Sequence, residues 1–214
     1  MADHDDLDDS FQDRIVDQLK KGMEHNRTFY LRSIDRTITI EWEDESKNIV
    51  KIIDCSFEEF VPFKSDGRIK WRHTFSAGSN QTNDDYSQTM SVSVDGKKIN
   101  PKKQGDGADN QVVYEYTMKG KPIYRVLKRI ERNWDISADP LIVYISRHIV
   151  ESLRIEINCI PDNVRPFFEE HHLINKFLVQ PNSAEDARPF DYVTKCSEPI
   201  LPGDGFSICL IKNS

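Results

Sequence analysis

Apolar and polar residues alternate with a period of two over much of this sequence. The clearest case is segment 153–159, LRIEINC, in which every second residue is apolar and the residues between are Arg, Glu and Asn. Such alternation is typical of a β-strand with one buried face, because successive side chains point to opposite sides of the strand. Similar or strand-like runs occupy residues 37–43, 49–57, 69–75, 91–99, 111–118, 140–146 and 206–212. The sequence therefore predicts a mainly β protein with about nine strands.

The strands follow one another at short spacing, without the helices that a parallel α/β sheet requires between successive strands. Asp95-Gly96 separates two short strand-like runs, and this dipeptide favours the positive φ angles of a tight hairpin. We therefore predict an antiparallel β-sandwich or open barrel formed by a single domain over residues 27–214. Six of the ten prolines follow residue 160. They predict an irregular segment 161–200 with short strands near 164–168 and 175–179.

Residues 1–26 are predicted to form an acidic tail followed by an amphipathic α-helix. The first ten residues include five Asp. In segment 10–25, Phe11, Ile15, Leu19 and Met23 recur every four residues and form one apolar stripe. This stripe can pack on the domain's own sheet or dock on another chain.

The composition also predicts a compartment and a redox state. No apolar run approaches the roughly 18–20 residues that span a bilayer, and the N-terminus is acidic, so we predict a cytoplasmic protein without a membrane contact. The four cysteines Cys55, Cys159, Cys196 and Cys209 are widely separated. This spacing predicts reduced, buried thiols rather than a zinc site, and we predict neither a metal nor a cofactor.

Sequence motifs of the common enzyme classes are absent. The chain has no phosphate-binding glycine loop, no G-x-S-x-G elbow and no H-E-x-x-H. A catalytic site can still assemble from scattered residues, so a hydrolase or transferase that uses His73, His148, His171 or His172 with nearby acids remains an alternative. His171 and His172, beside Glu169 and Glu170, also form the densest cluster of possible metal ligands, but a polar surface loop or short helix is the favoured interpretation because a metal site needs a fuller ligand set. We predict no catalytic residue.

One stretch concentrates positive charge. Six Lys or Arg residues and one acid lie between Lys119 and Arg132, and residues 97–132 carry ten basic and four acidic residues, a local charge of +6. Because the whole chain has a formal charge of −7, the remainder carries −13, which disfavours binding of long nucleic acid. Segment 119–134 fits a helix by periodicity and a strand by context, with a hairpin-like turn at Lys119-Gly120-Lys121.

The basic stretch supplies the candidate binding residues Arg125, Lys128, Arg129 and Arg132, because guanidinium groups suit bidentate recognition of carboxylate or phosphate. The alternative is a solvated face whose charges pair with the protein's own acids. The leading functional prediction is a non-enzymatic binding module, a sensory or accessory subunit. It would engage a partner protein or a small anionic ligand through end loops and this basic patch. A further alternative is an assembly component that docks through its N-terminal helix. A homo-oligomer is compatible with the binding module, with the hydrolase or transferase and with the assembly component.

Overall fold

The computed structural model describes residues 28–63, 68–75, 88–100, 102–103, 112–171, 177–181, 191–196 and 198–213. Strands make up nearly all regular structure in these ranges, and the helical exception is a short 3-10 turn, η1 (Glu45–Lys47). The mainly β prediction is therefore confirmed. The predicted helix at 10–25 lies outside the described residues, as do residues 76–87 and 104–111.

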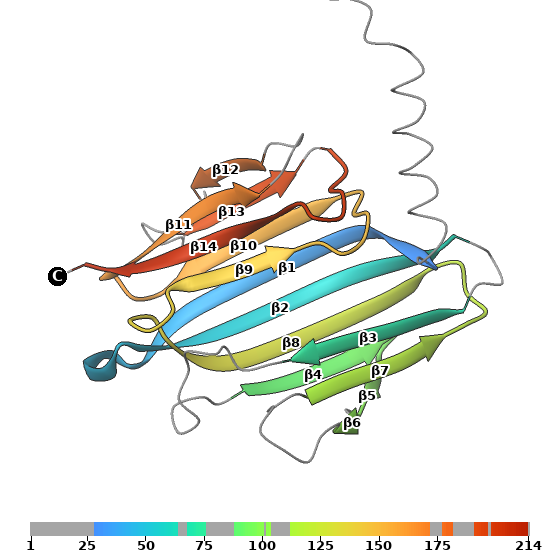
Figure 1. Cartoon of the computed structure of the whole chain (residues 1–214), viewed down its shortest axis with the longest axis horizontal. Helices are drawn as coiled ribbons and strands as arrows, with labels where there is room; N and C mark the ends of the chain where they lie inside the picture. The colour runs from blue at the N-terminus through green and yellow to red at the C-terminus, as the bar shows by residue number, and fades with distance from the viewer. Residues whose placement is uncertain are drawn as a thin grey trace, which may run out of the picture.

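The strands form one large sheet and two small ones (Figure 1). The large sheet has the order β12 (Phe177–Pro181), β13 (Tyr192–Cys196), β10 (Leu153–Cys159), β1 (Phe29–Asp44), β2 (Ile49–Pro62), β8 (Tyr124–Asp135), β4 (Gln88–Val94) and β5 (Lys97–Ile99). The second sheet has the order β11 (Val164–His171), β14 (Gly205–Lys212) and β9 (Leu141–Ile145). The third has the order β3 (Ile69–Phe75), β7 (Val112–Met118) and β6 (Lys102–Lys103).

Both small sheets lie in front of the large sheet in Figure 1, β14 and β9 over one half and β3 and β7 over the other, with β2 and β8 visible between them. Ile69 and Trp71 of β3 and Phe206 and Ile208 of β14 belong to the same buried apolar cluster as the side chains of the large sheet. The protein therefore has a two-layer β architecture. We call the covered side of the large sheet its inner face and the other side its outer face.

The prediction of a purely antiparallel arrangement is wrong. β1 and β10 pair in parallel, in a register that runs from Ile34 opposite Leu153 to Ile40 opposite Cys159. Parallel neighbours need a long crossover connection. Here the described part of the chain between β1 and β10 supplies that connection mainly with other strands, β2 to β9, rather than with an α-helix. The described residues also contain fourteen strands rather than about nine, partly because segment 161–200 holds β11, β12 and β13.

The predicted hairpin at Asp95-Gly96 is confirmed. Asp95 and Gly96 have φ angles of 48° and 78°, which suit a two-residue turn, and Val94 pairs with Lys97 across it. The predicted hairpin at Lys119-Gly120-Lys121 is wrong. Gly120 does adopt a positive φ of 83°, but β7 pairs with β3 and β6 while β8 pairs with β2 and β4. The turn therefore carries the chain from a small sheet to the large one.

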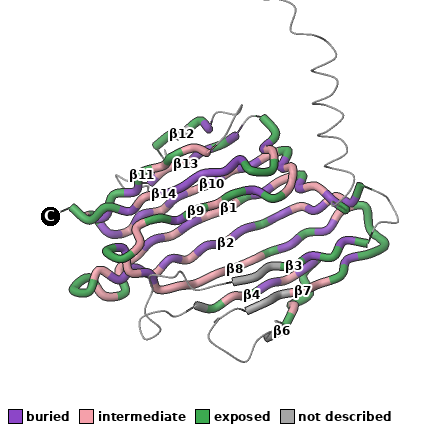
Figure 2. Tube along the Cα trace, in the orientation of Figure 1, coloured by how far each residue is buried: buried purple, intermediate pink, exposed green. Residues whose placement is uncertain are grey.

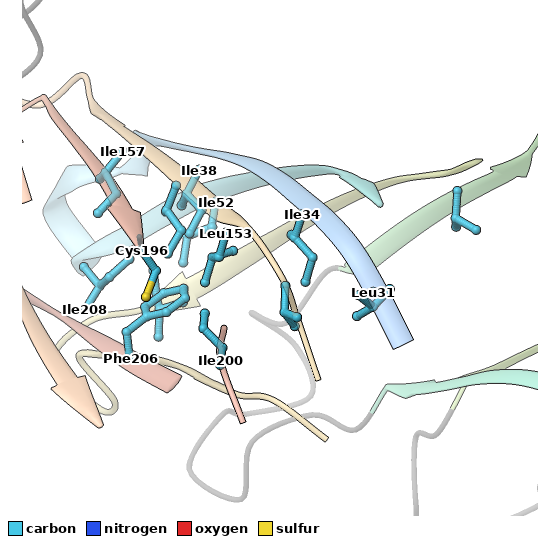
Figure 3. Packing of buried hydrophobic residues seen from close by; sticks show 14 of the residues in the cluster. Leu31, Ile34, Ile38, Ile52, Leu153, Ile157, Cys196, Ile200, Phe206 and Ile208 are labelled. Carbon is cyan, nitrogen blue, oxygen red and sulfur yellow. The ribbon is translucent and has the colours of Figure 1, made fainter. Parts of the chain in front are cut away.

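The core lies between the layers, and buried positions alternate along the central strands (Figure 2). Figure 3 shows Phe206 and Ile208 of β14 gathered with Ile38, Ile52 and Ile157 of the large sheet. Burying one such side chain contributes about 1.5–3 kcal/mol to folding, so this apolar seam is the main force that joins the layers.

All four cysteines are unpaired, with Cys159 and Cys196 buried and Cys55 and Cys209 half-buried. Burial, together with the charges of Asp191 and Asp162, raises the pKa of the Cys159 thiol to about 12. The predicted burial of the cysteines therefore holds fully for two of the four. In the part of the chain that the structure describes, no helix is long and apolar enough to cross a membrane.

Candidate functional site

The basic stretch folds as strand β8, and the two faces of this strand divide the four candidate residues. Val126 is fully buried and Lys128 shares its inner face, as does Arg132 four residues after Lys128. Arg125 and Arg129 point from the outer face. The four side chains therefore do not form one patch, because successive residues of a strand point to opposite sides of the sheet.

The outer pair contacts the protein's own acids. Arg125 Nε lies 3.3 Å from Glu59 Oε1, and Arg129 Nε donates to Glu131 Oε1 at 2.8 Å. The Arg129 contact with Glu131 raises the pKa of the Arg129 guanidinium. Both arginine side chains are exposed, so these ion pairs add little to stability.

The inner face of β1, β2 and β8 holds a second set of charges, which we call the inner cluster. It consists of Arg36, Asp54, Glu58, Lys128 and Arg132. Arg36 donates to the two carboxylate oxygens of Asp54 from Nε at 2.9 Å and from Nη2 at 2.6 Å. Lys128 forms an ion pair with Glu58, whose Oε1 also accepts a hydrogen bond from the Ser56 hydroxyl at 3.2 Å. The side chains of both pairs are only 8–13% exposed.

The strand register explains why these residues meet. Ser56 of β2 lies opposite Arg36 of β1 on one side and opposite Lys128 of β8 on the other. Asp54 and Glu58 are two residues to either side of Ser56 on the same strand, so their side chains share its face. Residues far apart in the sequence are thereby brought into one compact group.

Aromatic rings border the inner cluster. The Arg36 guanidinium lies 5.3 Å from the Tyr144 ring centroid and 5.6 Å from that of Phe206. Arg132 lies 4.7 Å from the Trp134 ring centroid. These distances are in the range of cation–π contacts, which strengthen where water is excluded. Burial and the charge of Glu58 raise the pKa of the Tyr144 hydroxyl, against the effect of a hydrogen bond with Ser146.

The pKa of Asp54 depends on the charges of the other residues in the inner cluster. Burial by itself would raise the pKa of this carboxyl. The charge and hydrogen bonds of Arg36, with the further charges of Arg132 and Lys128, outweigh that effect and lower the pKa below its usual value. Asp54 is therefore a buried carboxylate kept ionised by its cationic neighbours.

Sequence reasoning found Lys128 and Arg132 but missed Arg36, Asp54 and Glu58. For Asp54 and Glu58, the alternation of buried and exposed positions along β2 contained a signal. In segment 52–60, Ile52 and Phe60 mark the buried face, and Asp54, Ser56 and Glu58 stand at the intervening positions of that same face. Charged residues at positions expected to be apolar are an indication of a functional site.

A groove lies on the small sheet that contains β3 and β7. It has a volume of about 490 Å³ and is lined by Lys70, Trp71, Arg72, Glu115, Tyr116 and Thr117. Arg72 lies 3.6 Å from Glu115 at the surface of this groove. The groove is a second place where aromatic and basic residues meet, but its ion pair is exposed to solvent.

The histidines considered for catalysis lie in different places. His73 is in β3, His148 follows β9 with its ring 4.4 Å from that of Phe29, and His172 lies outside the described residues. His171 Nε2 is 3.0 Å from the Ser207 hydroxyl across β11 and β14. Within the described ranges, no group of three His, Cys, Asp or Glu side chains is arranged to hold a metal ion.

Comparison with known proteins identifies a shared fold but no family. No protein-family model matches the sequence, and no curated protein matches it. The structure is similar to a protein from Legionella pneumophila that is provisionally designated a nutrient binding protein, with a TM-score of 0.54 and 10% identity. The match covers 86% of this chain and 67% of that one.

Weaker similarities extend to two other proteins. An M1 zinc metallopeptidase from Deinococcus radiodurans gives a TM-score of 0.42 at 9% identity, over 86% of this chain and 43% of the peptidase. An acetylcholine-binding protein from Biomphalaria glabrata gives 0.26 at 10% identity, over 94% and 98% of the two chains. This chain thus spans less than half of the peptidase, and the likeness to the Legionella protein concerns the fold alone.

Proposed function

We propose that this chain is a non-enzymatic binding module whose inner cluster binds a small anionic ligand, within a single domain formed by residues 27–214. The observation that carries the proposal is a set of three cationic and two anionic side chains, including two nearly buried ion pairs, Arg36–Asp54 and Lys128–Glu58, on a sheet face that is otherwise largely apolar. The proposal retains Lys128 and Arg132 from the sequence prediction and adds Arg36, Asp54 and Glu58.

Folding alone does not require such a cluster. Removing two charges from water costs several kcal/mol per ion, and apolar side chains of similar volume often stabilise a core equally well. The neighbouring inner-face positions Ile38, Ile52 and Val126 are apolar and fully buried. A charged cluster in this setting is better explained by recognition than by stability.

The chemistry of the cluster favours an anion over a cation. The five side chains carry a formal charge of +1, since Arg36, Lys128 and Arg132 outnumber Asp54 and Glu58. Two guanidinium groups and one ammonium group present many N–H donors, and the planar guanidinium fork matches carboxylate and phosphate oxygens. The rings of Tyr144, Phe206 and Trp134 provide apolar walls beside these donors.

A thermal-shift screen followed by calorimetry tests the proposal. The probes are inorganic phosphate, succinate, citrate and adenosine monophosphate, each compared with sodium chloride at the same ionic strength. We expect at least one probe to raise the melting temperature beyond the salt control. A ligand present at 100 times its Kd stabilises the folded state by about 2.7 kcal/mol.

Two double variants show whether the anion binds at the inner cluster. Lys128→Met combined with Glu58→Gln removes the buried pair without leaving either charge alone, and it is expected to abolish the shift. Arg129→Met combined with Glu131→Gln removes a matched ion pair from the outer face of the same strand, and it should leave the shift unchanged. A wild-type protein that no probe stabilises beyond the salt control, or an equal shift in both paired variants, would refute the proposal.

A further inference from the structure

The outer face of the small sheet β11–β14–β9, the side turned away from the core, carries a group of exposed apolar side chains. They are Leu141, Val143, Ile145, Phe167 and Ile211, each between 43% and 56% exposed. The strand register makes them neighbours, because Phe167 lies opposite Cys209 and Cys209 lies opposite Leu141. We call this group the apolar face. Contiguous apolar surface of this kind marks an interaction site more often than scattered exposed residues do.

Strand β9 forms one edge of this sheet and lacks the features that usually keep an edge strand from pairing with another chain. In the described part of the chain, β9 pairs only with β14, and its five residues, LIVYI, include no charge and no proline. Natural edge strands are usually blunted by lysine, proline or a bulge. An apolar edge beside an apolar face indicates a surface that a partner covers.

The positions of the charged residues on β11 indicate which partner covers the apolar face. Arg165 and Glu169 flank Phe167 on the outward side of this strand, two residues before it and two residues after it. All three side chains are exposed, and the Arg165 guanidinium lies 5.0 Å from the Phe167 ring centroid. An antiparallel copy of the same strand, centred on Phe167, would place each arginine opposite a glutamate. The charge pattern is therefore complementary to itself.

We propose that a second copy of this chain covers the apolar face, around a twofold axis that runs across the strands near Phe167. β11 of one copy then faces β11 of the other in antiparallel orientation, and Arg165 of each copy pairs with Glu169 of its partner. Such a self-complementary patch is what an isologous dimer interface requires. The inference is independent of ligand binding at the inner cluster, which lies on the opposite side of this small sheet.

The size of the face predicts a weak dimer. Eight residues of β11 and three strands span roughly 26 Å by 14 Å. A stable interface usually buries about 800 Å² on each partner, which is more than this face offers. Assembly is therefore expected to be reversible and to depend on protein concentration.

Sedimentation velocity over a range of concentrations up to several hundred micromolar tests the proposal. We expect the wild type to dimerise as concentration rises. Arg165→Glu and Glu169→Lys each replace two attractive contacts by two repulsive ones, and each should weaken the dimer about tenfold. Both positions are exposed, so both variants are expected to keep the fold, which thermal unfolding checks.

Restoring the complementarity provides the decisive comparison. The double variant R165E/E169K should dimerise like the wild type, and an equimolar mixture of the two single variants should form a mixed dimer. Leu127→Asp, on the outer face of the large sheet, serves as the control and should leave the dimer intact. A monomer at every concentration overturns the proposal, and so does a double variant that stays as weak as the single ones.

Discussion

Arg36 and Asp54 form a two-point ion pair on the inner face of the large sheet, with donor–acceptor distances of 2.9 and 2.6 Å and side chains that are only 12% and 8% exposed. The pair joins β1 to β2 at the centre of the domain. Because both groups are shielded from water, breaking the pair and replacing it have opposite consequences for stability.

Breaking the pair is expected to be costly. Asp54→Asn keeps the shape of the side chain but leaves the Arg36 charge buried without its anion, so the free energy of unfolding at pH 7 should fall by about 3–5 kcal/mol. Denaturant unfolding of the variant and the wild type measures this difference. A loss below about 1 kcal/mol would show that the pair is solvated in solution.

The loss of stability caused by Asp54→Asn should depend on pH. The pKa of Asp54 in the folded protein is lower than its value of 3.8 in an unfolded chain, so its ionised form stabilises the fold fully above that value and less as the pH falls through the folded pKa. The stability difference between the wild type and Asp54→Asn should therefore be constant from pH 6 to 8 and shrink below about pH 4. A difference that does not change with pH would contradict the ionised state of Asp54.

Replacing the whole pair should be tolerated. Arg36→Met combined with Asp54→Leu substitutes apolar groups of similar volume, and the free energy of unfolding should change little or rise by about 1–4 kcal/mol. The same variant should lose the anion-induced thermal shift. A strongly destabilised double variant would instead assign the pair a structural role.

Gly205 is a site of steric constraint at the start of β14. A Cβ atom at this position would overlap the carbonyl oxygen of Tyr144 on β9. Gly205→Ala should therefore cost about 1–3 kcal/mol or more, because the overlap is with backbone. Gly96→Ala is the comparison, since its surroundings are open and only its φ of 78° opposes alanine, at about 1–2 kcal/mol. Thermal unfolding ranks the two, and an equal or smaller loss for Gly205→Ala would contradict the close packing of β9 against β14.

The cysteines should differ in reactivity. The pKa of Cys159 is raised to about 12 and that of Cys196 is raised as well, in both cases mainly by burial. Thiolates are the reactive species, so iodoacetamide at pH 8 should modify Cys55 and Cys209 before Cys159 and Cys196. Mass spectrometry of the peptides gives the order, and early labelling of Cys159 would argue against its burial.

The sequence predicted strands well where one face of the strand is buried. β10 and β14 and the β4–β5 hairpin were found because apolar residues alternate cleanly in them or a turn dipeptide marks them. β8 was ambiguous because Lys128 and Arg132 occupy inner-face positions and interrupt the apolar pattern. The residues that form the candidate site are thus the same ones that obscured the strand.

Strand partners were less predictable. Alternation gives the buried face of a strand but not its neighbour or direction, so the parallel pairing of β1 with β10 was missed. The prolines after residue 160 suggested irregular structure, yet Pro166 lies in β11 and Pro181 ends β12, both of which are edge strands. An edge strand tolerates proline because one side of its backbone needs no partner in the sheet. Arg36 and Asp54 come together only through the pairing of β1 with β2, which the sequence pattern does not specify.

The most direct test of the account is a map of where the anion binds. Two-dimensional ¹H–¹⁵N NMR spectra are recorded during titration with whichever of phosphate, succinate, citrate or adenosine monophosphate gives the largest thermal shift. We predict that the largest saturable changes occur at the amides of Arg36, Ser56 and Lys128 and in the side chains of the inner cluster. Changes confined to Lys70, Arg72 and their neighbours in the β3–β7 groove would contradict the assignment of the ligand to the inner cluster.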